Sequence, residues 1–318
     1  MSGGARANVL TQQMNGLQAA LRRQRGIVSR GRSGATVARS ASRPTAFGRV
    51  LEKVAIAERC LRSGTSEGRT AAWRLVAQTF QPAGTLVSVP IPDDDQGRPL
   101  AIRAQTTDFA AFVTCIVDAV YRVPTSHARF AAEWLEQIEA SGDRPLIVDA
   151  GANIGASAAM LAIEWPSAHL VAVEPAPENV ELLTANAERF PTIDVVAEAL
   201  GCEDGSLSLV SGRGFDAFRT EAGGDGLQVP VSSVTSLVGR SPGTPFFLKV
   251  DVEGAEVDVF RDPAAWDFPI IAIEAHDWLF PFEQRLEPFL SGHVSRGRDL
   301  LVVGGGVLFS IARPDAQA

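Results

Sequence analysis

The sequence predicts an α/β fold built on a mostly parallel sheet, and two observations lead to this prediction. The apolar run from Leu146 to Val148 passes through Asp149 into a turn that contains Gly151 and Gly155. Short apolar runs then alternate with segments of helical spacing. An apolar run that leads through a glycine-rich turn into a helix is typical of a buried parallel strand followed by a nucleotide-binding loop. A cofactor that carries a nucleoside is therefore expected.

The parallel sheet is assigned to five short apolar runs. These strands are expected at residues 145–149, 169–174, 193–199, 246–251 and 269–275. Helices are expected between them at residues 155–164, 177–190 and 254–260. Such crossovers are almost always right-handed, so strands and helices in this alternation build one parallel sheet.

Further elements are expected on both sides of this region. Helical spacing and turn residues predict helices at 47–62, 69–80, 108–121 and 127–140, with a hairpin at 85–92 and 99–103. The runs at 207–210 and 227–231 predict a β excursion or lid before the fourth strand. The runs at 299–303 and 307–311 bracket three glycines, which predicts a final antiparallel hairpin.

Charge divides the chain into regions. Residues 1–49 contain nine arginines and no acidic residue, whereas all 37 acidic residues follow them. We expect residues 1–49 to be a basic, disordered tail, in preference to a transit peptide or an arm for nucleic acid or membrane surfaces. Residues 50–140 are expected to be a helical and hairpin extension, and residues 141–318 the main domain. The acidic main part argues against nucleic acid as substrate.

Composition favours a protein of the cytoplasm. Cys60, Cys115 and Cys202 lack C-x-x-C spacing, so neither a disulfide framework nor a zinc site is indicated. No apolar stretch approaches the roughly 20 residues that a membrane span requires. The start of the chain lacks the apolar core of a secretion signal.

The turn after the first strand favours one kind of nucleoside cofactor. A dinucleotide fingerprint needs a middle glycine that lets the backbone approach a pyrophosphate, and Asn153 stands in its place. S-adenosylmethionine carries no phosphate, so this turn suits it better. Glu174 ends the second strand, where a carboxylate can accept hydrogen bonds from both hydroxyls of a ribose.

Four motifs, taken in order, resemble one enzyme family. They read D-A-G-A-N-I-G from Asp149, V-E-P around Glu174, F-L-K-V-D-V-E-G-A-E from Phe247 and I-E-A-H up to His276. With the lead-in at residues 100–108 and 118–121, the chain is similar to the FkbM family of S-adenosylmethionine-dependent methyltransferases over about residues 85–312. The resemblance implies a Rossmann-like class I methyltransferase fold, with a mostly parallel seven-stranded sheet and a terminal antiparallel hairpin.

The resemblance also implies which residues bind the cofactor. The residues expected at its methionine end are Asp149, Gly151, Asn153 and Gly155. Glu174 is expected to hold the ribose hydroxyls, while Ala199 and Leu200 are expected near the adenine.

Candidate catalytic groups gather where the fourth and fifth strands end. Asp251 and Glu253 end one strand, and Glu274 and His276 end the next, so the four should meet at the carboxyl edge of the sheet. His276, with a near-neutral pKa, is the ready general base, which Glu253 or Glu274 could orient or replace. Alternatively, Asp251, Glu253 and Glu274 could bind a divalent cation that acidifies a substrate hydroxyl. A capping or surface role is the alternative for His276.

Lys249 lies inside an apolar strand, where an ammonium is unusual. Strand alternation places Lys249 and Asp251 on one face, about 6.5 Å apart along the strand. Two roles stay open: an ion pair that satisfies both charges, or a direct part in catalysis.

The expected function is methyl transfer from S-adenosylmethionine to a hydroxyl oxygen of a small molecule, a sugar or glycan, or a polyketide-like acceptor. An NAD(P)-dependent oxidoreductase is the first alternative, although the missing glycine and the lack of a Tyr-x-x-x-Lys pair argue against it, since Tyr121 is the only tyrosine. A non-catalytic module that binds S-adenosylmethionine is the second. The aromatic segment at residues 278–282 is expected to form an apolar wall of the acceptor pocket.

Overall fold

The computed structural model describes residues 64–211, 218–221, 226–276 and 283–314, together with Ile56, Arg59, Cys60 and Arg62. The chain from Val50 to Ala318 forms one compact unit, which does not include Met1–Arg49. The predictions for the basic tail and for residues 278–282 lie outside the described residues, as does most of the helix expected at 47–62.

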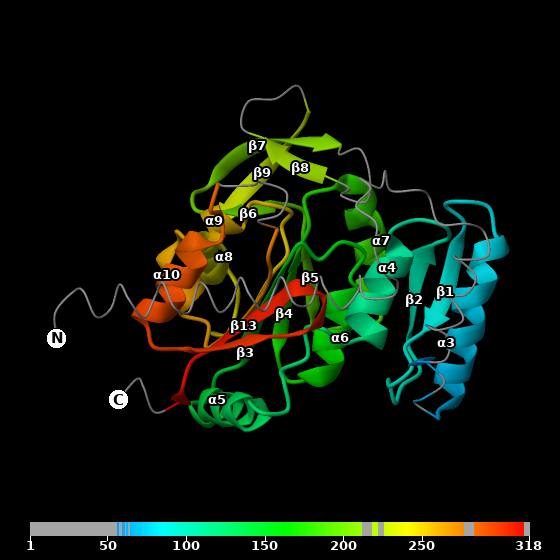
Figure 1. Ribbon diagram of the computed structural model, residues 1–318, viewed down its shortest axis with the longest axis horizontal. Helices are drawn as coiled ribbons and strands as arrows, with labels where there is room; N and C mark the ends of the chain where they lie inside the picture. The colour runs from blue at the N-terminus through cyan, green and yellow to red at the C-terminus, as the bar shows by residue number, and fades with distance from the viewer. Residues whose placement is uncertain are drawn as a thin grey trace, which may run out of the picture. The chain divides into compact units, whose positions relative to one another are not determined.

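A seven-stranded sheet forms the centre of the unit (Figure 1). Its strands are β3 (Pro145–Ala150), β4 (His169–Val173), β5 (Ile193–Val196), β10 (Thr244–Val250), β11 (Ile270–Glu274), β12 (Asp299–Val302) and β13 (Val307–Ile311). They lie in the order β12-β13-β11-β10-β3-β4-β5. Six of them point in the same direction, and β13 points in the opposite direction. This arrangement confirms the predicted α/β fold with its mostly parallel sheet and final hairpin.

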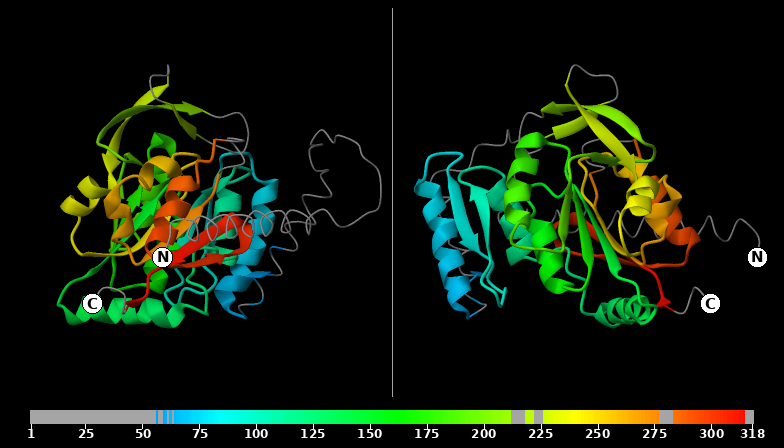
Figure 2. Two further views of the ribbon diagram at one scale, coloured as in Figure 1. Left: turned by 60° about the vertical axis from the view of Figure 1, so that its left-hand side comes forward. Right: turned by 180° about the vertical axis from the view of Figure 1, so that it is seen from behind.

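Helices cover both faces of this sheet, which explains why β3 and β4 are buried along their whole length. Figures 1 and 2 show α6 (Ala156–Glu164) and α7 (Pro177–Ala187) on one face, and α8 (Val234–Arg240) and α10 (Glu287–Ser295) on the other. Three other helices are α5 (Ala128–Ala140), the short α9 (Glu256–Val259) and the 3-10 turn η3 (Pro263–Trp266). The chain builds outward from β3 to β5 and then returns to β10 on the other side of β3. The switch point between β3 and β10 is where open α/β sheets bind their ligands.

The segment before the sheet contains a helix and a hairpin. Its elements are α3 (Ser66–Ala77), the 3-10 turn η1 (Gln78–Phe80), and the paired strands β1 (Leu86–Pro90) and β2 (Pro99–Arg103). The helix expected at 108–121 is shorter than predicted: α4 (Asp108–Phe112) passes into a π-helical turn, η2 (Val113–Val117). Asn186 of α7 ties the hairpin to the sheet, because its side chain hydrogen-bonds the backbone N–H and carbonyl of Ala101 and the carbonyl of Ile154.

A second, four-stranded sheet is inserted between β5 and β10. It consists of β6 (Ala199–Gly201), β7 (Gly205–Ser211), β8 (Phe218–Glu221) and β9 (Leu227–Ser233), in the order β6-β9-β7-β8. The single strand expected at 193–199 is therefore divided, since residues from Ala199 onward pair with β9 instead of β4. Within the described residues, no helix is both long and apolar enough to cross a membrane.

Candidate active site

The turn after β3 brings the backbone of two strands close together at the switch point. Gly151 has a φ of +76°, and a Cβ there would lie 1.8 Å from the backbone oxygen of Asp251. Only glycine fits this position. Asn153 and Glu253 also have left-handed backbone, with φ of 51° and 49°, and both line the clefts described below. Strained non-glycine residues of this kind are concentrated at functional sites.

Glu174, directly after β4, faces this turn and is only 6% exposed. One carboxylate oxygen accepts a hydrogen bond from the backbone N–H of Asn153 at 2.9 Å. The other accepts from the N–H of Ala176 at 3.0 Å and from the amide of Asn179 at 3.3 Å. Burial raises the pKa of Glu174, and these hydrogen bonds offset part of the rise.

A series of side-chain hydrogen bonds connects Glu174 through Asn179 to the segment before the sheet. Arg103 of β2 donates to the amide oxygen of Asn179 at 2.8 Å. The same guanidinium is held by the buried Asp108 through two bonds of 2.8 Å. The hairpin before the sheet therefore helps to set the orientation of the Glu174 carboxylate.

The first cleft lies beside Glu174, and its wall includes Gly151, Asn153, Glu174, Asn179, Glu198, Ala199, Leu200, Leu209, Asp251 and Glu253. Ala199 and Leu200, which are predicted to lie near the adenine, line the same cleft as Glu174. Two other predicted residues are not in the wall. Asp149 is fully buried beneath it, and a Cβ at Gly155 would meet Leu183 of α7 at 2.8 Å.

Lys249 lies under the turn and is 1% exposed. Its ammonium lies 3.0 Å from Asp149 and 3.5 Å from Asp251, and it donates to the carbonyl of Gly151 at 2.8 Å. Burial alone would lower the pKa of Lys249, but the charges of Asp149 and Asp251 raise it above its ordinary value. The ammonium is thus fixed as a cation that joins the turn to β10, which is the ion-pair role left open by the sequence.

The second cleft adjoins the first and shares Thr107, Gly151, Asn153, Asp251 and Glu253 with it. Its remaining wall is Ala110, Ala111, Thr114, Cys115 and Tyr121 from the segment before the sheet, with Ala152, Ala156, Ser157, Lys249 and Glu274 from the sheet side. Ser157 also donates to Asp149 at 2.6 Å. The two clefts therefore meet where Asp251 and Glu253 lie.

Asp251 and Glu274 are joined through Tyr121. The Tyr121 hydroxyl lies 3.0 Å from an oxygen of Asp251 and 3.1 Å from an oxygen of Glu274. Burial, together with the charge of Asp251, raises the pKa of Glu274 to about 7. Around neutral pH, Glu274 is therefore a partly protonated group.

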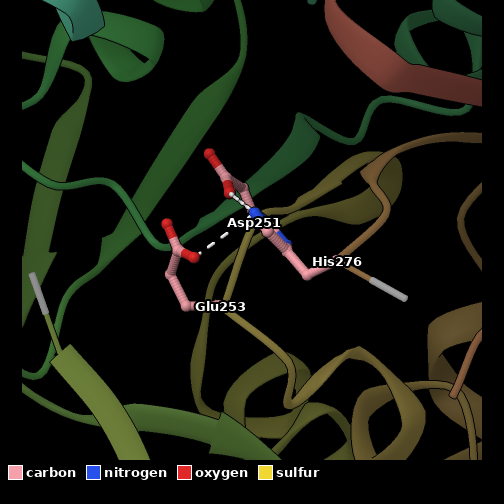
Figure 3. A group of neighbouring side chains, drawn as sticks. All are labelled: Asp251, Glu253 and His276. Atoms are coloured by element: carbon pink, nitrogen blue, oxygen red, sulfur yellow. Dashed lines mark ion pairs between the residues drawn. The ribbon is translucent and has the colours of Figure 1, made fainter. Parts of the chain in front are cut away.

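His276 lies between three acidic side chains. Its Nδ1 is 2.6 Å from Glu256. Its Nε2 faces Glu253 at 3.4 Å and Asp251 at 3.9 Å (Figure 3). Burial would lower the pKa of His276, but the hydrogen bond to Glu256 and the charges of Glu253 and Asp251 raise it to about 9. The pKa thus lies above the near-neutral value expected from the sequence, which favours the imidazolium form at pH 7.

The three acids expected to bind a divalent cation, Asp251, Glu253 and Glu274, do not form one group in the structure. Glu274 is directed at Tyr121. The three side chains whose donor atoms all lie within 4.8 Å of one another are Asp251, Glu253 and His276. His276 takes the place in this group that was expected for Glu274. The reason is that β11 ends at Glu274, and the residues after it place His276 beside Glu256.

Residues 149–299 match the family model for the methyltransferase FkbM domain. This part of the chain is similar to the FkbM methyltransferases. "Methyltransferase 1" of Beauveria bassiana (strain ARSEF 2860) is 31% identical over 153 residues, which cover 39% of this chain and 61% of that relative. This chain thus covers less than two thirds of that relative's length.

Two solved structures resemble the chain at low sequence identity. The methyltransferase FkbM from Methylobacillus flagellatus KT has a TM-score of 0.36 and 18% identity, with 64% of this chain and 53% of that chain covered. An O-methyltransferase from Bacillus cereus, solved in complex with SAH, has a TM-score of 0.32 and 12% identity, with 64% and 90% covered.

Several polar residues around the FkbM domain site were not assigned from the sequence. Asn179 and Glu256 contact Glu174 and His276 through pairings that no local pattern reveals. The sequence prediction uses Tyr121 only in the lead-in motif and in the argument against an oxidoreductase, although its hydroxyl contacts two candidate catalytic acids. Its position as the sole tyrosine, shortly before the first strand of the sheet, was the one signal available.

Proposed function

We propose that the protein transfers a methyl group from S-adenosylmethionine to a hydroxyl oxygen of a small molecule, a sugar or glycan, or a polyketide-like acceptor. The observation that carries the proposal is the buried carboxylate of Glu174 in the wall of the first cleft, held by the backbone of the glycine turn. The carboxylate oxygen that accepts from Asn153 has a further lone pair that suits a ribose hydroxyl.

The first cleft fits an adenosyl group better than a dinucleotide. Gly151 leaves the space that a Cβ would fill, whereas Asn153 stands where a pyrophosphate loop has its second glycine. Among the described residues that line the two clefts, Lys249 is the only basic side chain, and its charge is already paired with Asp149. A pyrophosphate would therefore lack a cationic partner here. When bound, S-adenosylmethionine supplies an electrophilic methyl group on a cationic sulfonium, which acidic walls favour.

The acceptor hydroxyl must lose its proton as its oxygen bonds to the methyl carbon. Asp251 and Glu253 lie where the two clefts meet, so either carboxylate can take that proton. The ring of His276 lies 3.4 Å from Glu253 and 3.9 Å from Asp251. We therefore assign proton removal to Asp251 or Glu253, with His276 as their neighbouring cation.

This assignment does not call on a divalent cation. An imidazolium has no free lone pair, so His276 cannot coordinate a metal until it loses its proton. We expect methyl transfer to survive exhaustive chelation with EDTA. Activity that is lost on chelation and restored by Mg²⁺ or Mn²⁺ would show that a cation replaces the imidazolium proton among Asp251, Glu253 and His276.

The test is a screen of hydroxyl-bearing acceptors with S-adenosylmethionine that carries a radiolabelled methyl group. The label should enter an ether, which resists mild alkali, whereas a methyl ester would release it as methanol. Asp251→Asn with Glu253→Gln should lose labelling, while the exposed Glu136→Gln serves as the matched control. A base-labile or nitrogen-bound label would contradict transfer to a hydroxyl oxygen.

A further inference from the structure

Tyr121 reaches the transfer site from outside the matched FkbM domain. It is 1% exposed and lies in a loop after the π-helical turn η2, ahead of residues 149–299. Its hydroxyl is 3.0 Å from Asp251 and 3.1 Å from Glu274. The ammonium of Lys249 lies 5.1 Å from the centre of its ring, and Cys115 is part of the same cleft wall. The phenol thus lies between the ends of β10 and β11.

The number of protons restricts how this group can be bonded. A phenol has one proton, so it can donate to only one of the two carboxylates. The second contact is a full hydrogen bond at the same time only if that carboxyl group carries a proton of its own and donates it to the phenol oxygen. The ammonium of Lys249 lies 3.5 Å from Asp251, whereas burial favours the protonated form of Glu274. The arrangement that satisfies every partner runs from Glu274 to Tyr121 to Asp251, each donating to the next.

We propose that Tyr121 is a positioning residue of the transfer site, whose hydroxyl fixes the Asp251 carboxylate toward the acceptor oxygen and links it to Glu274. The assignment of Asp251 to the acceptor rests on the proposed function, but the hydrogen-bonded unit itself does not. The segment before the FkbM domain then contributes a positioning residue to the site, in addition to residues that line the second cleft.

The single tyrosine makes the hydrogen-bonded unit directly measurable. Protein produced with [¹³Cζ]tyrosine should give one tyrosine resonance, whose chemical shift reports the hydrogen bonds of that hydroxyl. Glu274→Leu should move this resonance, because the leucine side chain has neither a donor nor an acceptor for the phenol. The exposed Glu136→Leu should leave it in place. A resonance that is unchanged in Glu274→Leu would overturn the proposal.

A kinetic measurement tests the positioning role. Tyr121→Phe keeps the ring and removes the hydroxyl, so kcat should fall on the order of tenfold, the effect of one hydrogen bond to a charged group. The Kd for S-adenosylmethionine should stay within about twofold. An unchanged kcat, or a loss confined to cofactor affinity, would overturn the positioning role. If the wild-type protein binds no S-adenosylmethionine, the proposed function fails, while the resonance test of the unit still stands.

Discussion

At the residue scale, Lys249 connects the two halves of the site. Its ammonium contacts Asp149 below the turn, the carbonyl of Gly151 within it, and Asp251 beyond β10. Breaking a buried ion pair by removing one partner leaves the other charge buried without compensation. The fixed cation therefore contributes to stability and to the geometry of the turn together.

Lys249→Met should lower the free energy of unfolding by about 3 to 5 kcal/mol, the usual cost of an uncompensated buried charge. Adding Asp149→Asn should restore part of the loss, because it removes the stranded carboxylate. Urea unfolding of the two variants and the wild type measures both effects. Equal stability of Lys249→Met and wild type would show that the pair is not buried as described.

His276 gives a prediction with a defined pH window. Its pKa is raised to about 9 in the folded protein from an ordinary value of 6.5. A raised pKa means that the stabilisation is fully present below pH 6.5 and is lost as the pH rises through about 9. The pKa of Glu274 is raised from 4.5 to about 7, so its contribution to the stability of the folded protein is lost in a lower range, as the pH rises from 4.5 to 7.

The Tm of the wild type should therefore fall between pH 6.5 and 9.5, and it should fall less steeply in His276→Gln. Differential scanning fluorimetry over this range provides the comparison. Parallel curves for the two proteins would rule out His276 as the titrating group.

At the scale of elements, the β3 turn is shaped by the carboxyl end of β10. Gly151 allows the two backbones to approach, and the ammonium of Lys249 holds them there. The turn then presents the N–H of Asn153 to Glu174 at the end of β4. Three neighbouring strands thus define the first cleft by backbone contacts and a few fixed charges.

Gly151→Ala should weaken S-adenosylmethionine binding at least tenfold, because a Cβ would lie 1.8 Å from the Asp251 oxygen and displace the turn. Gly142→Ala is the matched control, since Gly142 has a φ of +82° and no atom within 4 Å of its Cβ position. The control should lose about 1 kcal/mol of stability from backbone strain, with its affinity unchanged. Equal affinities by calorimetry in the two variants would contradict this account of the turn.

At the scale of the whole unit, the parallel strands, the crossovers and the final hairpin were predictable, because each is encoded locally. The runs at 145–149 and 246–251 carry their apolar pattern within a few residues, and the turn carries its glycines. The positions of Asp251, Glu253, Glu274 and His276 follow from the ends of adjacent strands. The strand expected at 193–199 was divided because residues from Ala199 onward pair with β9, which is distant in sequence.

The remaining features depend on contacts between distant segments. Tyr121 meets Asp251 and Glu274 across more than a hundred residues, and a single sequence contains no pattern for such pairing. The raised pKa of His276 depends on Glu256, which the helix α9 brings beside it. The close approach of Gly155 to Leu183 of α7 likewise joins segments that are distant in sequence. The sequence was therefore sufficient to find the motifs of the candidate site. It was not sufficient to predict the protonation state of their side chains or the distant residues that contact them.

The central claim is that the first cleft holds an adenosyl group by the carboxylate of Glu174. Isothermal titration calorimetry of the wild type and Glu174→Ala with S-adenosylmethionine, with NAD as the competing ligand, tests it most directly. We expect one S-adenosylmethionine per chain, no binding of NAD, and an affinity at least tenfold weaker in Glu174→Ala, since a buried carboxylate that accepts hydroxyl hydrogen bonds contributes more than about 1.4 kcal/mol. Binding of NAD in place of S-adenosylmethionine, or equal affinity in the two proteins, would contradict it.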